Sequence, residues 1–184
     1  MPPSADPIRW QIIDTMIGDF LTMDTTGYFY PPEDVASITP PIHEYLNDRA
    51  LETMTVYGIW IEDSDTTERT SGRKDKTMRV FIQAARRYTP PQAAADPFKQ
   101  RNADIDPEEE ERSKLAHDVE RFIDLESTIG GGDQLGGLYE NWELLGDDSF
   151  QVTTVRCPGW VMIQFETQFT YHTRLGEPTL QGAA

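Results

Sequence analysis

The strictest pattern in this sequence is an alternation of side chains between residues 160 and 172. Large apolar side chains recur at every second position with one interruption, and the positions between them are mostly polar. Successive side chains of a β-strand point to opposite faces, so this segment predicts a strand with one buried face and one polar face. The apolar members are Val161, Ile163, Phe165, Phe169 and Tyr171. A sheet containing such a strand needs a second layer to cover its apolar face.

Three further segments predict strands. Residues 55–62 and 77–88 alternate in the same way and predict an antiparallel hairpin, while 150–155 is expected to form a second hairpin with 160–172. Residues 63–76 are polar throughout and too long for a tight turn, so they are expected to project from the sheet as a loop. Residues 139–148 are expected to be a connection.

Two helices are expected, and both begin at an Asp-Pro pair. Asp can cap a helix and Pro fits its first turn, which predicts helices opening near Asp6-Pro7 and Asp106-Pro107. Apolar residues recur at helical spacing in both segments. In the first they are Ile8, Ile12, Ile13, Met16, Ile17, Phe20 and Leu21, and in the second Leu115, Val119, Phe122 and Ile123.

The order helix, hairpin, helix, hairpin predicts an α+β fold. We expect an antiparallel or mixed sheet built from two β-hairpins, with the two main helices packed on one face. The 184 residues suit a single domain over 1–184. Long loops are expected at 24–55, which has room for a short helix over 42–49, at 63–76 and at 89–106, with a flexible C-terminal tail over 173–184.

Composition limits the cellular locations that are expected for this chain. Its longest apolar stretches, such as 160–165, fall far short of the roughly 20 residues that span a bilayer, and residues 1–4 lack the basic and apolar segments of a secretory signal. We therefore expect a soluble protein made inside the cell, without a membrane partner. Cys157 is the single cysteine, which excludes an internal disulfide.

Charge is segregated along the chain. The formal net charge is -16, yet residues 69–101 hold nine bases and two acids, whereas 102–148 hold fifteen acids and three bases. The acidic total argues against wrapping nucleic acid, which requires clustered Lys and Arg. Two interpretations stay open for the segregation, namely solvated loops of opposite sign or complementary edges that meet between subunits.

Catalytic chemistry has weak candidates. The three histidines lack metal-ligand spacing, and no nucleophile motif is present, so we expect no catalytic residue, no metal, no cofactor and no enzyme activity. The enzyme alternative is a metal-dependent nuclease using Glu62, Asp63 and Asp65, with Arg79 and Gln83 on the next strand. It lacks a lysine beside those carboxylates.

Three short stretches resemble the tail terminator and tail-completion (neck) proteins of tailed bacteriophages. They are the opening 7–14, the helix 115–123 followed by Leu-Gly-Gly-Leu at 135–138, and the closing 165–178, in which a long final strand leads to an aromatic residue, an Arg and a Gly-Glu-Pro turn. The loops 24–55 and 89–106 are longer than is usual in that family.

The resemblance implies a structural virion protein. It would form a ring, usually a homohexamer, at the head-proximal end of the tail, stopping growth of the tail tube and joining it to the head connector. Its partners would be other copies of itself, the tail tube protein and a head-completion or connector protein. Genome DNA would pass through the ring without sequence-specific binding. Assembly would take place in the host cytoplasm, and the final location would be the tail-neck junction of the virion.

Interface residues can be nominated from charge. We expect the basic residues Arg69, Arg73, Lys74 and Lys76 to contact a neighbouring subunit, and Glu108, Glu109, Glu110 and Glu111 to be the acidic counterpart. Two alternatives remain beside the nuclease. One is another neck component, either a head-completion or an adaptor protein, and the other is a small regulator that stays monomeric.

Overall fold

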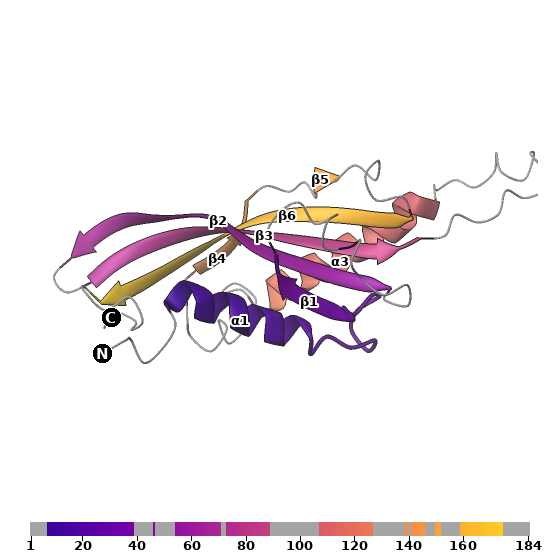
Figure 1. Cartoon of the computed structure of the whole chain (residues 1–184), viewed down its shortest axis with the longest axis horizontal. Coiled ribbons are helices and arrows are strands. Elements are labelled where there is room, and N and C mark those ends of the chain that lie inside the picture. Colours follow the sequence, from indigo (N-terminus) through magenta and orange to yellow (C-terminus); the bar gives the residue numbers. More distant parts are fainter. Residues whose placement is uncertain are drawn as a thin grey trace, which may run out of the picture.

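The protein, described here by a computed structural model, places two helices against one face of a mixed β-sheet (Figure 1). The structure describes residues 7–38, 46, 54–70, 73–88, 107–126, 139, 141–145, 150–151 and 159–174. The α+β class expected from the order of the elements is confirmed.

Both helices begin where the Asp-Pro pairs predict. Helix α1 spans Ile8–Phe20 directly after Pro7, whose φ of -52° suits a helix start. Helix α3 spans Pro107–Glu126 and carries glutamates in its first turn, where they favour the positive end of the helix dipole. Most of the apolar stripes are buried as expected, with Ile8, Ile12, Ile13, Met16 and Phe20 in α1 and Leu115, Val119, Phe122 and Ile123 in α3. Ile17 is only partly buried, and the expectation for Leu21 is wrong, because this residue follows the last turn of α1 and is 53% exposed.

Six strands form the sheet, in the order β1-β2-β3-β6-β4, with β5 also paired to β6. Their bounds are β1 Asp34–Ser37, β2 Thr55–Thr70, β3 Arg73–Arg87, β4 Asn141–Leu144, β5 Phe150–Gln151 and β6 Trp160–Arg174. Strands β1 and β2 run parallel, and every other pair is antiparallel. Strand β6 thus lies inside the sheet, between β3 on one side and β4 and β5 on the other.

The main core lies between the helices and one face of this sheet. Ile59, Ile82 and Phe165 are register neighbours on β2, β3 and β6, and all three are buried. Phe20 of α1 and Phe122 of α3 stack above them with ring centroids 3.8 Å apart, so the two helices also pack on each other. The alternation predicted for β2, β3 and β6 is therefore confirmed.

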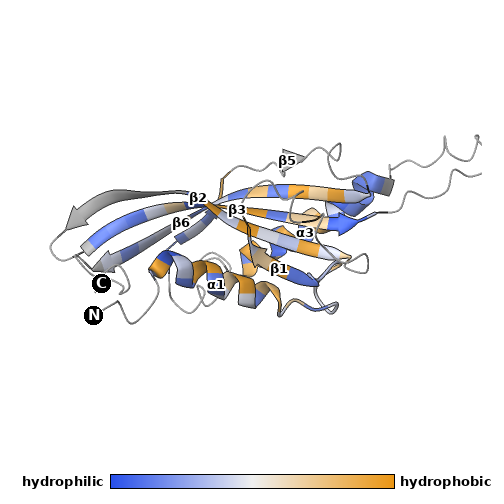
Figure 2. Ribbon diagram, in the orientation of Figure 1, coloured by the Kyte–Doolittle hydropathy of each residue, from blue (hydrophilic) through white to orange (hydrophobic). Residues whose placement is uncertain are grey.

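Apolar character is unevenly distributed along the strands. Figure 2 shows that hydrophobic residues gather where the helices cover the sheet, while the coloured part of β3 at the left of the view is hydrophilic. A smaller cluster on the opposite face joins Ile38, Leu46, Val56, Ala85, Trp160 and Met162. One end of the sheet is thus packed on both faces, and the other end has a polar surface.

The segment 63–76, expected to be a loop, forms strand instead. β2 continues to Thr70 and β3 begins at Arg73, with residues 71–72 outside the described part. Strand β6 accompanies β3 as far as the Arg73–Arg174 pair, so β3 has a partner on both sides here. Backbone hydrogen bonds on both edges explain how a polar segment without apolar alternation forms strand.

Other expectations need smaller corrections. The stretches expected as the 24–55 loop and the 139–148 connection contain β1 and β4, and residues 173–174 of the expected tail belong to β6. The construction from two hairpins is not confirmed, because the long partner of β6 is β3 and only two residues of the 150–155 strand are described, as β5. The loop 89–106, most of the helix 42–49 and the tail from 175 onward lie outside the described residues.

Candidate interaction surfaces

The basic residues nominated from charge gather at the end of the β2–β3 hairpin. Backbone register pairs Arg69 with Lys74 and Thr70 with Arg73, which places the nominated bases on the last residues before the turn. Lys74 and Lys76 are both partly buried and alternate with Asp75, so the two lysines share one face of β3. This is the face that α1 covers further along the strand, because Met78 and Val80 continue the same alternation into the core.

A third cation joins this group from α1. Burial lowers the pKa of Lys76, and the charges of Lys74 and Arg9 lower it further. Arg9 lies in the first turn of α1, which carries no acidic residue, and it packs its guanidinium 5.5 Å from the exposed Trp10 ring. We call Arg9, Lys74 and Lys76 the basic patch.

The four glutamates at the start of α3 have cations within their own subunit. Arg112 lies against Glu108 and Glu109, with Nη2 2.8 Å from Glu108 Oε1, and Lys114 Nζ lies 2.6 Å from Glu110. These are i,i+3 and i,i+4 pairs, which stabilise a helix by small amounts. The acidic surface expected here is therefore partly neutralised by its own helix.

Glu111 has a different role from the other three. Arg86 Nε lies 3.2 Å from Glu111 Oε2, and Arg86 also donates to Thr55 Oγ1 at 3.0 Å while its guanidinium stacks 3.7 Å from the centre of the Tyr30 ring. Burial raises the pKa of the Tyr30 phenol, and a hydrogen bond to Glu111 raises it further. This network ties α3 to β2, β3 and the segment after α1.

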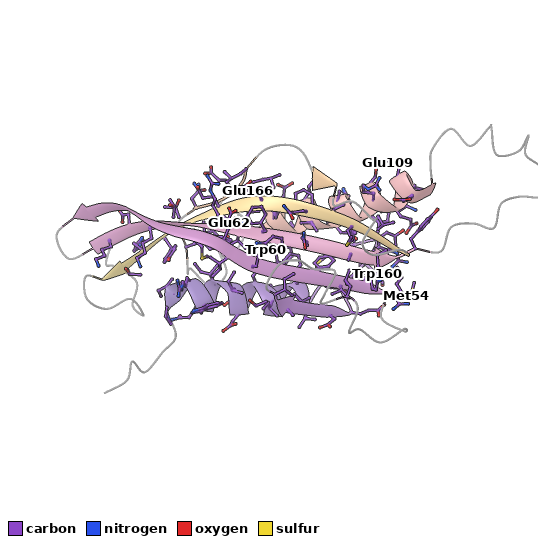
Figure 3. The ribbon with its side chains drawn as sticks, turned by 45° about the horizontal axis from the view of Figure 1, so that its top comes forward. Met54, Trp60, Glu62, Glu109, Trp160 and Glu166 are labelled. Atoms are coloured by element: carbon purple, nitrogen blue, oxygen red, sulfur yellow. The ribbon has the colours of Figure 1, made fainter. Side chains whose placement is uncertain are left out.

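The basic and acidic groups occupy opposite ends of the molecule. Figure 1 shows the β2–β3 turn at one end of the longest axis and the start of α3 near the other end, and Figure 3 labels Glu109 at that second end. Within one subunit these groups are too far apart to pair. They are able to meet only between different copies.

Asp118 is a buried carboxylate that no charge pattern pointed to. It is 0% exposed, and its two oxygens accept hydrogen bonds from the backbone N–H groups of Phe29 at 2.9 Å and Tyr30 at 2.6 Å. Burial raises the pKa of Asp118, and the two N–H donors lower it in part. The residue anchors the segment after α1 to α3, so its role is structural.

Of the residues of the nuclease alternative, Glu62, Arg79 and Gln83 lie on the outer face of the sheet, and the side chains of Asp63 and Asp65 lie outside the described part of the structure. Arg79 lies 3.3 Å from Glu166 and 4.0 Å from Glu62, and the stacked rings of Trp60 and Phe81 lie beside them, with Trp60, Glu62 and Glu166 labelled in Figure 3. Register pairs Asp63 with Arg79, and the Gln83 amide donates to Gln164 at 2.7 Å. Among the described residues, no group of three potential metal ligands comes together.

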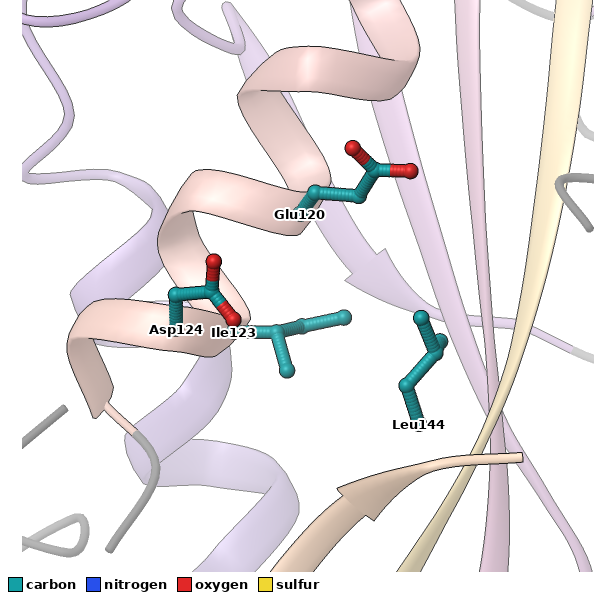
Figure 4. Close-up of a pocket in the computed structure, with 4 residues that line it drawn as sticks. All are labelled: Glu120, Ile123, Asp124 and Leu144. Atoms are coloured by element: carbon teal, nitrogen blue, oxygen red, sulfur yellow. The ribbon is translucent and has the colours of Figure 1, made fainter. Parts of the chain in front are cut away.

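A small pocket lies between α3 and β4. Glu120, Ile123, Asp124 and Leu144 line it, and its volume is about 210 Å³ (Figure 4). The two carboxylates come from adjacent turns of α3, and Ile123 faces Leu144 across the opening. The lining therefore combines negative charge with an apolar floor.

Comparison with protein-family models and with curated proteins finds no match to this chain. In the described part of the chain, no helix is long and apolar enough to cross a membrane.

Sequence reasoning missed Arg9, Arg86 and Asp118. Asp118 lies three residues after Leu115, on the buried stripe of α3, so helical periodicity alone would have placed it on the buried face. Arg9 and Arg86 show no comparable signal, because their neighbours come from elements distant in sequence.

Proposed function

We propose that this protein is a structural virion subunit that forms a ring, a homohexamer, at the head-proximal end of a phage tail. The ring terminates the tail tube and joins it to the head connector. The family resemblance of the sequence motivates this function. The separation of charge along an elongated subunit is the structural observation that carries it.

Opposite charges at opposite ends favour head-to-tail contacts between copies. Such contacts are heterologous, and they close into a ring when the rotation between copies divides a full turn. In this proposal Arg69, Arg73, Lys74 and Lys76 at the hairpin end face the neighbour's acidic end, which includes Glu108, Glu109, Glu110 and Glu111. Electrostatic complementarity of this kind sets the register of an interface.

The net charge of -16 suits a ring through which DNA passes. A lumen that attracted phosphates would slow the genome, whereas an acidic lumen repels the duplex and leaves it mobile. The proposed partners are the tail tube protein on one side and a head-completion or connector protein on the other. The proposed location is the tail-neck junction of the virion, after assembly in the host cytoplasm.

The first test is the mass of the purified full chain by light scattering across a wide range of concentration and salt, alone and with tail tubes. A discrete hexamer, or a monomer that becomes one on tubes, is the expected result. A strict monomer that binds neither tubes nor connectors would contradict the proposal. Binding to connectors but not to tubes would favour a head-completion or adaptor protein.

A further inference from the structure

We propose that the basic patch of Arg9, Lys74 and Lys76 receives the acidic surface around Glu120 of α3 in a second copy of this chain. This inference rests on the ring proposed above and names the contact that builds it. It differs from the charge-based expectation in two ways, because it adds Arg9 from α1 and moves the acidic counterpart along α3.

The basic patch gathers three positive charges from two elements that pack together, α1 and β3. Among the side chains that the structure describes, which leave out those of residues 63–70 on the paired strand, no acidic group lies within ion-pair distance of any of the three. Asp75 lies between the two lysines in sequence but on the other face of β3, where its register partner is His172. A cluster of like charges costs free energy unless an anion joins it, so the patch favours an acidic partner.

The acids at the start of α3 are weaker candidates for that partner than Glu120. Glu108, Glu109, Glu110 and Glu111 each have a cation of their own subunit within 4 Å. Glu120 is exposed, and no basic group of the described residues lies within ion-pair distance of it. Breaking existing ion pairs would offset what a new contact gains, whereas Glu120 has no ion pair with a described residue to lose.

The surroundings of Glu120 match the shape of a lysine side chain. Ile123 and Leu144 provide apolar surface for its methylene stem, and the exposed Glu120 carboxylate beside them provides a negative charge for its ammonium group (Figure 4). The basic patch and this pocket are different surfaces of the subunit. Their contact is therefore head-to-tail and compatible with a closed ring.

The test is a charge swap in the full chain, read as the dissociation constant of self-association from light scattering. Lys74→Glu with Lys76→Glu is expected to raise that constant about tenfold or more, and Glu120→Lys is expected to do the same. The chain carrying all three substitutions is expected to regain most of the affinity, because the charges are exchanged. Lys76→Arg, which keeps the charge, is expected to behave like wild type.

Arg79→Glu is the matched control. It reverses one charge on the same strand, half the change made by the lysine double variant, but on the outer face of the sheet, where the Arg79 side chain is 53% exposed. It is expected to leave self-association unchanged. Circular dichroism and thermal unfolding of every variant show that each one folds.

Other results would overturn the inference in distinguishable ways. Normal rings from the lysine double variant would remove the basic patch from the interface and leave the ring itself standing. If Arg79→Glu weakened self-association as much as the lysine double variant does, the cause would be net charge in general and not the basic patch. Weaker retention of duplex DNA by the lysine variant, with its mass unchanged, would assign the patch to phosphate. A wild-type chain that never self-associates, even on tubes, would overturn both this inference and the proposed function.

Discussion

At the scale of single residues, Asp118 is a buried polar group that ties α3 to the segment after α1. Asp118→Asn keeps one oxygen acceptor but turns an amide N–H₂ toward one of the two backbone donors of Phe29 and Tyr30. We expect the free energy of unfolding to fall by about 1–3 kcal/mol, the cost of a lost buried hydrogen bond. Urea unfolding measures it, with Glu120→Gln, an exposed position on the same helix, as the control. Equal stability of the two variants would contradict this role.

The pH dependence of the same residue has a definite sign. Because the pKa of Asp118 is raised in the fold, the folded state binds its proton more readily than the unfolded state does. The cost of the buried charge is present above the folded pKa and disappears as pH falls through it toward 3.8, the ordinary pKa of an aspartate. Over that range we expect wild type to gain stability relative to Asp118→Asn. If wild type instead lost stability relative to Asp118→Asn over the same pH range, the two hydrogen bonds would affect the pKa of Asp118 more than burial does.

At the scale of elements, replacing either of two glycines by alanine is expected to change the free energy of unfolding, with opposite signs. Gly159 has φ of +85°, and its carbonyl accepts from Tyr88 N at 2.9 Å, which joins the end of β3 to the start of β6. Gly159→Ala strains the backbone there, and we expect a loss of roughly 1–2 kcal/mol. Gly18 lies in α1, where an added Cβ meets nothing within 4 Å, so Gly18→Ala is expected to gain about 0.5–1 kcal/mol. Denaturant unfolding of both variants tests the pair, and effects of the same sign would contradict it.

The open edge of β2 is the element most exposed to unwanted pairing. β1 pairs only with residues 56–59 of β2, and no other described strand lies along the rest of that edge. Register shifts between Ile61 and Asp63 and between Thr66 and Glu68 twist this edge, and bulges of this kind discourage pairing with another chain. The edge is therefore less suited to joining copies than the charged ends are.

Elements with an apolar period could be predicted from sequence, and those without one could not. Helices α1 and α3 and the buried halves of β2, β3 and β6 follow directly from the spacing of their apolar residues. The hairpin end escaped prediction because its strands depend on pairing with β6, which lies about a hundred residues further along the chain. β1 and β4 have four residues each, too few for a period to show.

For the candidate interface, sequence located the charges but not their partners. It nominated Lys74 and Lys76 from their charge but placed them in a loop, and their position on one face of β3 came only from the structure. It could not show that Arg112 and Lys114 neutralise the start of α3, or that Arg9 approaches Lys76. Those contacts depend on how the helices pack, which no local pattern encodes.

At the scale of the whole molecule, the net charge of -16 opposes compaction. Self-repulsion destabilises the folded state, and salt screens it over a Debye length of about 10 Å at 0.1 M. We therefore expect the midpoint of thermal unfolding to rise when sodium chloride is increased at constant pH and protein concentration. A fall would mean that the ion pairs along α3 and around Arg86 contribute more to stability than the net repulsion costs.

The place of β6 inside the sheet also has a consequence for biosynthesis. β6 follows every other strand in sequence yet lies between β3 and β4, so the ribosome releases the middle of the sheet after its flanks. Until then, β3 presents an unpaired edge, and Ile82 and Val80 lack their neighbours on β6. Nascent chains should therefore fold only once β6 has left the exit tunnel, and chains that stall before it should be the ones that chaperones hold.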